Sequence, residues 1–282
     1  MRLALTIIAV TATLLTGCAR TPQPGSPRPA NAFEQRAEQV AQAWRSATVE
    51  KAFVPMQDLT IAPKDGFPSD QLKQAYLAGW YTTTATLPSE AGPGTIRYPD
   101  GSTTDVPVQS ATDSFRAIDL GDPGPGGVAL EVTGAKGGTA TIRTSRGDAE
   151  VPVWFFTIKG MSQPVARVSV APEAIRPLPT PPTLGPIDPS AHFVIAQDLT
   201  AVSGSTIDYR LGVGACDKEI TPLLWESSDI VVIGGSIQPP PPDISCTAQL
   251  LLHPVKVTTK DPIGSRMILD AVTGNPVLLT TR

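Results

Sequence analysis

Cysteine is the residue type with the most reactive side chain in this chain of 282 residues, and it occurs three times. Cys216 and Cys246 lie about 30 residues apart, and no histidine directly flanks either of them. In an oxidising compartment such an isolated pair is most simply a disulfide, which would stabilise the fold by about 3–4 kcal/mol through loop closure. The alternative is a reactive thiol, which needs a setting that lowers its pKa. We expect the disulfide.

Other residues that commonly bind metals or carry catalysis are few and scattered. The two histidines, His192 and His253, form no His-x-His pair, and the chain has no Cys-x-x-Cys, so no zinc site is expected. The chain also lacks the Gly-x-Ser-x-Gly nucleophile motif, a phosphate-binding loop and a dinucleotide-binding motif. We therefore predict no catalytic residue, no metal ligand and no cofactor.

Two pairs of acidic residues flank predicted turns. They are Asp119 with Asp122, and Glu226 with Asp229. Paired carboxylates can hydrolyse glycosides and loop carboxylates can bind calcium, but the calcium-loop pattern Asp-x-Asp-x-Asp-Gly is missing. Turns also carry acidic residues for solubility alone, and this is the preferred interpretation.

Two aromatic runs, Trp80-Tyr81 and Trp154-Phe155-Phe156, have side chains that can stack on sugar rings. Successive residues of a strand point to opposite faces of a sheet. We therefore expect one residue of each run to lie in the core and another to be exposed, with core packing favoured over a sugar-binding platform.

The first eighteen residues have the pattern of an export and attachment signal. Arg2 precedes an apolar run from Leu3 to Leu15, which is typical of a signal peptide and too short to span a bilayer. The run ends in Leu15-Thr16-Gly17-Cys18, which resembles the lipobox of bacterial lipoproteins. We expect residues 1–17 to be removed and Cys18 to carry the lipid. The protein would then be anchored at the extracytoplasmic face of the cell membrane.

The composition favours a turn-rich β protein and excludes some partners. Proline (30) and glycine (24) are abundant, whereas aromatic residues make up 5% and charged residues 17% of the chain. The formal net charge is −4 and lysine and arginine form no cluster, so neither nucleic acid nor anionic lipid is an expected partner. The oligomeric state does not follow from the composition.

Residues 31–171 are predicted to form an α+β domain with two short helices. The first helix is predicted over residues 31–47, which place apolar side chains on one helical face. The second is predicted over residues 69–78, because Ser69 can cap its start and Gly79 can end it. Two similar hairpins are predicted farther on. Their strands are residues 95–97 with 106–108 and residues 141–143 with 151–153.

Proline-rich segments divide the rest of the chain. Residues 18–30 are predicted to be a tether, and residues 172–189, with seven prolines, a stiff linker. Residues 190–282 are predicted to form a β-sandwich-like domain with the disulfide between its middle strands. Residues 207–213 alternate as in a half-buried strand, whereas residues 230–233 are continuously apolar, which indicates a strand buried on both faces.

Several short segments carry a family resemblance. They are Ala43-Trp44-Arg45 with Phe53-Val54-Pro55-Met56, residues 144–147 with 151–157, and residues 262–266 with Leu269-Asp270 and Thr273-Gly274. On these segments the chain resembles a family of uncharacterised secreted lipoproteins of actinobacteria. The resemblance covers most of the chain after the tether. It implies the domain layout and the location, and it implies no catalytic residue.

These observations together predict a lipid-anchored envelope protein that works as a binding or scaffold module and not as an enzyme. Its expected partners are the membrane, through the lipid, and a cell-envelope protein or wall polymer. Two alternatives stay open. One is a cell-wall-active hydrolase that uses loop carboxylates, and the other is a small-ligand sensor for a membrane partner.

Overall fold

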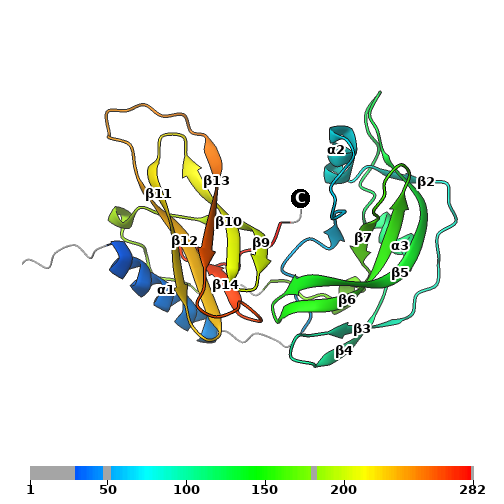
Figure 1. The fold of residues 1–282 in the computed structure, drawn as a ribbon, viewed down its shortest axis with the longest axis horizontal. Coiled ribbons are helices and arrows are strands. Elements are labelled where there is room, and N and C mark those ends of the chain that lie inside the picture. Colours follow the sequence, from blue (N-terminus) through cyan, green and yellow to red (C-terminus); the bar gives the residue numbers. More distant parts are fainter. Residues whose placement is uncertain (1–28, 47–51, 179–182, 281–282) are drawn as a thin grey trace, which may run out of the picture.

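The structure, a computed structural model, describes residues 29–46, 52–178 and 183–280. These residues form two β-rich modules that lie next to each other along the long axis of the molecule (Figure 1). We call residues 52–178 the N-terminal module, and residues 29–46 together with 183–280 the C-terminal module. The predicted mainly β fold with short helices is confirmed. The predicted signal segment and Cys18 lie outside the described residues.

The N-terminal module contains one seven-stranded sheet and two short helices. Its strands are β1 (Thr60–Ile61), β2 (Tyr81–Thr83), β3 (Pro93–Arg97), β4 (Thr103–Pro107), β5 (Leu130–Thr144), β6 (Gly147–Ile158) and β7 (Val165–Val168). Its helices are α2 (Asp70–Ala78) and α3 (Ala111–Arg116). The long strand β6 pairs with β5 on one side and with β7 and β3 on the other. It is therefore the centre of this module.

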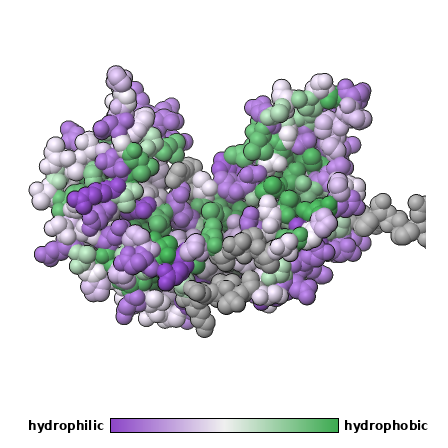
Figure 2. All heavy atoms as spheres, turned by 180° about the vertical axis from the view of Figure 1, so that it is seen from behind, coloured by the Kyte–Doolittle hydropathy of each residue, from purple (hydrophilic) through white to green (hydrophobic). Residues whose placement is uncertain are grey.

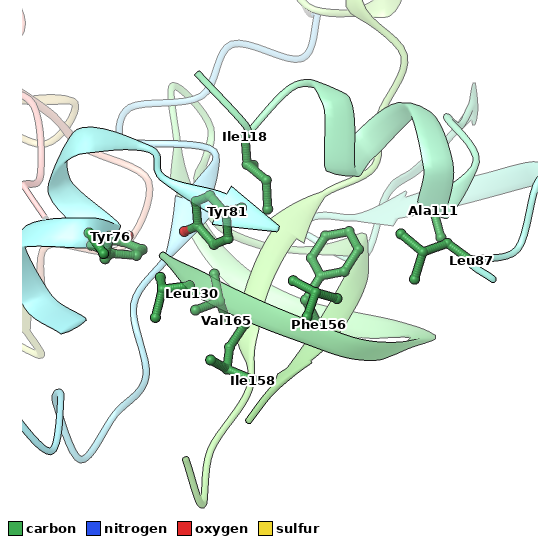
Figure 3. Close-up of a cluster of buried hydrophobic side chains, with 11 residues drawn as sticks. Tyr76, Tyr81, Leu87, Ala111, Ile118, Leu130, Phe156, Ile158 and Val165 are labelled. Carbon is green, nitrogen blue, oxygen red and sulfur yellow. The ribbon is translucent and has the colours of Figure 1, made fainter. Parts of the chain in front are cut away.

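Helix α2 has the ends that were predicted. The Ser69 side chain accepts a hydrogen bond from the Leu72 N–H at 3.3 Å, and Gly79 adopts a left-handed φ of 71° at the C-cap. Helices α2 and α3 cover one face of the sheet, where Phe156 and Ile158 of β6 pack among side chains from both helices (Figure 3). This packing buries the first of two cores in the module.

The two predicted hairpins are present as β3–β4 and β5–β6, within one sheet. Their strands pair closer to the turns than predicted, residues 95–97 with 103–105 and residues 141–143 with 148–150. Each turn contains a glycine with positive φ, Gly101 at 81° and Gly147 at 92°. The second core lies on the sheet face opposite the two helices. It includes Val151 and Val153 of β6, with Phe53 from the segment before β1.

The C-terminal module is a sandwich of two sheets. Its strands are β8 (Phe193–Val194), β9 (Ala196–Ser203), β10 (Thr206–Gly214), β11 (Lys218–Glu226), β12 (Ile230–Gln238), β13 (Leu250–Thr258) and β14 (Met267–Asp270). One sheet has the order β13-β10-β9, and the other has β11-β12-β14 with β8 also paired to β12. Single-turn 3₁₀ helices, Pro172–Ala174 and Pro189–Ala191, lie at the two ends of the proline-rich segment.

Helix α1 (Pro29–Ser46) packs on the outer face of the β11-β12-β14 sheet. Its buried side chains, among them Phe33, Val40 and Trp44, contact Ile230 and Val232 of β12. The grouping of this helix with residues up to 171 was therefore wrong, because its apolar face is covered by the module that follows the linker. The same contact explains the continuous apolar run in β12. Val231 and Ile233 face the sandwich core, and the alternate residues Ile230 and Val232 face α1.

The predicted disulfide between Cys216 and Cys246 is confirmed, with a Cα–Cα distance of 6.1 Å. Its position differs from the prediction, because it joins two connections and not two middle strands. Cys216 lies between β10 and β11, and Cys246 lies between β12 and β13. The link therefore holds the loops at one end of the sandwich.

The two modules are joined by direct contacts as well as by the linker. The Leu279 N–H donates to the Met56 carbonyl at 2.9 Å, and the Leu199 N–H of β9 donates to the Leu278 carbonyl at 2.8 Å. The end of the chain thus runs between the modules (Figure 1). The buried Arg143 side chain adds hydrogen bonds to the carbonyl oxygens of Gly264 and Arg266, at 3.1 and 3.0 Å. Seen from behind, the modules form two lobes with a notch between them (Figure 2).

Candidate functional site

Two adjoining hollows lie on the N-terminal module, on the sheet face opposite α2 and α3. Their volumes are about 490 and 370 Å³, and both are lined by Phe155, Gln163 and Pro164. We call the combined surface the Phe155 groove. Volumes of this size fall in the range of small-molecule sites, about 300–1,000 Å³.

Strand pairing explains why an aromatic ring lies at the floor of the groove. Ile61, Ala166, Phe155 and Lys136 occupy directly paired positions on β1, β7, β6 and β5. Directly paired residues share one face of a sheet, so their side chains form a row across the groove. The row is apolar in its middle and ends in a lysine at its β5 side.

One of two adjacent glycines in β5 gives the Phe155 ring the space it occupies. A Cβ atom at Gly138 would lie 2.8 Å from Cε2 of Phe155, which is closer than such contacts allow. A Cβ at Gly137 would lie 3.5 Å from the Trp154 ring, an ordinary contact. The Phe155 ring therefore lies across a strand position that only glycine leaves free.

The rim of the Phe155 groove is polar and carries charges of both signs. Lys64 and Lys136 are exposed cations, and Glu150 is the acidic residue among the lining side chains. Neutral hydrogen-bonding groups complete the rim: Thr139, Thr141, Thr157, Ser162 and Gln163. The lining contains no histidine or cysteine, and no pair of carboxylates. The groove is suited to binding a ligand with one flat apolar side and several polar groups.

Two other hollows contain arginines that already have partners. In a hollow of about 280 Å³ beside α1, the Arg36 side chain donates to the carbonyl oxygens of Ala271, Gly185 and Val272 at 2.8 Å each. In a hollow of about 440 Å³ between the modules, Arg146 lies 3.6 Å from the Tyr98 ring centroid and pairs with a carboxylate. Both arginines hold parts of the fold together.

One of the two acidic pairs considered for hydrolysis, Glu226 with Asp229, is bound to basic groups. Arg266 donates to Glu226 at 2.9 Å, and Arg45 donates two hydrogen bonds to Asp229 at 2.8 and 2.7 Å. Burial acts to raise the pKa of Glu226, but its hydrogen bonds with Arg266 and the Lys260 N–H outweigh this and lower it. The Arg45 hydrogen bond likewise lowers the pKa of Asp229. Neither carboxyl is thus prepared to act as a general acid near neutral pH.

The remaining candidate residues are not brought into one site. Asp119 and Asp122 lie in the Gly/Pro-rich connection between α3 and β5, where Asp119 accepts a long hydrogen bond from the Gly121 N–H. His192 ends a 3₁₀ helix and His253 lies in β13, both exposed. Within the described ranges, no three His, Cys, Asp or Glu side chains are arranged to hold a metal ion.

The prediction for the aromatic runs holds only in part, because each run has a buried residue but none is fully exposed, and Trp80 packs half-buried against the first core. Tyr81 and Phe156 are buried in the first core, and Trp154 is half-buried, with its indole N–H donating to the Gln109 carbonyl at 2.9 Å. Phe155 is the residue of its run that faces the groove. Alternation along β6 thus indicated that a ring would face away from the first core, and this ring, Phe155, is half-buried. Gly138 in β5, which leaves room for the Phe155 ring, was the signal that sequence reasoning missed.

Comparison of this chain with protein-family models, with curated proteins and with solved structures finds no match. The resemblance to secreted lipoproteins of actinobacteria therefore stays a prediction. Among the residues with described positions, no helix has the length and apolar character needed to cross a membrane.

Proposed function

We propose that this protein is a lipid-anchored binding protein of the cell envelope, without enzymatic activity, and that the Phe155 groove is its ligand site. The observation that carries the proposal is the groove itself, which combines an aromatic floor with a polar rim and whose lining contains no histidine, no cysteine and no pair of carboxylates. Of the two acidic pairs, Glu226 and Asp229 are each bound to an arginine, which counts against a hydrolase that uses this pair.

Two features support the proposed location. The segment Leu15-Thr16-Gly17-Cys18 follows an apolar run of signal-peptide length, and Cys216 and Cys246 form a disulfide. Disulfides persist in oxidising compartments outside the cytoplasm. A lipid on Cys18 would hold the protein at the outer face of the membrane, within reach of wall polymer.

The groove favours a ligand that has both a flat apolar side and hydroxyl or amide groups. A sugar ring stacks its C–H face on an aromatic ring while its hydroxyl groups reach polar side chains. Phe155, with Thr139, Thr141 and Gln163 on the rim, matches this chemistry. Wall-derived glycan or glycopeptide fragments are therefore the proposed ligands.

The first test is a thermal-shift screen of the chain from residue 18 on against wall glycan fragments, short peptides and divalent metals. A ligand at 100 times its dissociation constant stabilises the folded state by about 2.7 kcal/mol. We expect glycan fragments to raise the melting temperature of the N-terminal module. Steady conversion of wall polymer to products, or a shift confined to the C-terminal module, would contradict the proposal.

A second test addresses the anchor. After cell fractionation, the wild-type protein is expected in the membrane fraction with acyl chains on residue 18, detected by mass spectrometry. The Cys18→Ala variant should leave that fraction. Wild-type protein that is processed without any acyl group would refute the proposed anchor and leave the groove proposal to the binding screen.

A further inference from the structure

Exposed apolar side chains gather at one end of the C-terminal module. Leu250, Leu251 and Leu252 are 63%, 39% and 45% exposed, and Ile244 is 48% exposed. These four residues, which we call the apolar tip, are half of the eight large apolar side chains that are exposed in the described ranges. They lie within nine positions of the sequence and therefore form a local patch.

The topology of the sandwich explains why the apolar tip is uncovered. Strand β13 is an edge of the β13-β10-β9 sheet, and among the residues that the structure describes no strand pairs with its outer side. Leu250 and Leu252 are paired with two glycines of β10, which have no side chains to cover them. Leu251 is paired with Val213 on the opposite face, at the open end of the sandwich. Leucines thus emerge on both faces of the strand.

The apolar tip is held in place by covalent constraints. The Cys216–Cys246 disulfide ties the β12–β13 connection to the β10–β11 turn. The connection also contains the run Pro239–Pro242, whose backbone dihedrals are restricted, and the Ile244 N–H donates to the Pro241 carbonyl at 3.0 Å. Because these residues are ordered in advance, docking them on another surface costs little conformational entropy.

We propose that the apolar tip inserts into the bilayer that carries the lipid anchor. This inference rests on the anchoring part of the proposed function. Ten residues lie between Cys18 and the start of α1 at Pro29, so the eleven steps of the tether reach at most about 36–40 Å. The start of α1 and the β12–β13 connection both lie at the end of the molecule away from the N-terminal module (Figure 1). The anchor therefore brings this end next to the lipid surface.

The charges around the apolar tip specify the kind of membrane contact. Asp217, Glu219 and Asp243 outnumber Lys218 among the nearby charged residues, so anionic lipid provides no attraction. Contact would come from leucine side chains entering the acyl region, as in other membrane-surface elements. It would leave the N-terminal module, with the Phe155 groove, directed away from the bilayer.

A second copy of the chain fits the apolar tip less well than a lipid surface. Pairing of two edge strands needs a continuous row of free N–H groups, and Pro254 in β13 interrupts such a row. A lipid surface needs no hydrogen-bond register and accepts leucines from both faces of the strand.

The test measures how strongly the protein binds lipid vesicles without its lipid anchor. The protein used is the chain from residue 18 on, which contains every described residue and carries the Cys18→Ser substitution. Neutral phosphatidylcholine vesicles are the probe, and flotation separates bound from free protein. We expect weak binding that is insensitive to salt and no stronger with anionic lipid. Leu250→Asp with Leu252→Asp should lower the bound fraction about tenfold or more, since burial of one leucine side chain is worth about that much in partitioning. The matched control, Leu120→Asp, changes the most exposed leucine of the other module and should bind like the parent.

A second measurement places the apolar tip directly. A Leu251→Trp chain is coupled through Cys18 to a maleimide lipid. Brominated acyl chains should quench its tryptophan fluorescence more strongly than that of the parent chain coupled in the same way, which has the four native tryptophans. Absence of this stronger quenching, or equal vesicle binding by the parent and the double variant, would overturn the proposal. So would a dimer in sedimentation that the double variant loses. Neither measurement uses cellular lipidation, so failure of the anchor in cells would leave these results unchanged.

Discussion

Removal of one aromatic ring from α1 tests whether this helix belongs to the C-terminal module. Phe33 is 3% exposed and packs edge-to-face on Phe193, with ring centroids 5.8 Å apart and an interplanar angle of 81°. Replacing a buried phenylalanine with alanine costs about 3–5 kcal/mol, because the apolar contact is lost and a cavity remains. We therefore expect Phe33→Ala to destabilise the C-terminal module by that amount and to leave the N-terminal module unaffected.

The assay is thermal and urea unfolding followed by tryptophan fluorescence, since Trp44 and Trp225 both adjoin the contact between α1 and its sheet. For a module of this size the expected loss corresponds to a melting temperature lower by about 10–20 °C. Glu38→Ala, on the exposed face of the same helix, is the control and should change stability by less than about 0.5 kcal/mol. A loss below about 1 kcal/mol for Phe33→Ala would refute the packing argument.

Three further predictions follow from single contacts. The Arg45 hydrogen bond lowers the folded-state pKa of Asp229, so the ionised Asp229 carboxylate stabilises the fold above pH about 4, and this stabilisation is lost as the pH falls. Urea midpoints measured at decreasing pH should show this loss, and the Asp229→Asn variant should not show it. Reduction of the Cys216–Cys246 disulfide should cost about 3–4 kcal/mol in unfolding experiments, and an unchanged stability would show that the loops are held without it. Gly138→Ala should displace the Phe155 ring and weaken ligand binding, whereas Gly137→Ala should not; equal titration results for both would contradict the steric argument.

Helix ends and hairpins could be predicted from the sequence, because capping residues and turn glycines act on neighbouring positions of the chain. Helix α2 begins after Ser69 and ends at Gly79, because a side-chain cap and a left-handed residue act within a few positions of the chain. The β3–β4 and β5–β6 hairpins follow from branched residues around glycine turns. The four apolar residues of β12 correctly indicated burial on both faces.

What covers an apolar surface could not be predicted from spacing alone. The stripe on α1 indicates that a partner exists, but its partner in β12 lies nearly 200 positions farther along the chain. The disulfide pairing was predictable because two cysteines remain after Cys18, whereas the placement of the link in loops depends on where β10 and β12 end. The groove depends on a cross-strand pairing of Phe155 with residues of β5 and β7, which a linear pattern does not contain.

Ligand titration of two phenylalanine variants tests the central claim, that the Phe155 groove is the binding surface. Phe155→Leu keeps apolar bulk but removes the flat ring, and Phe67→Leu makes the same change at a half-buried position outside the groove. Calorimetry with a wall glycan fragment should give measurable affinity for the parent and for Phe67→Leu, and an affinity about tenfold or more lower for Phe155→Leu, consistent with loss of about 1–3 kcal/mol of stacking and burial. Equal affinity in all three proteins would place the ligand elsewhere and contradict the account.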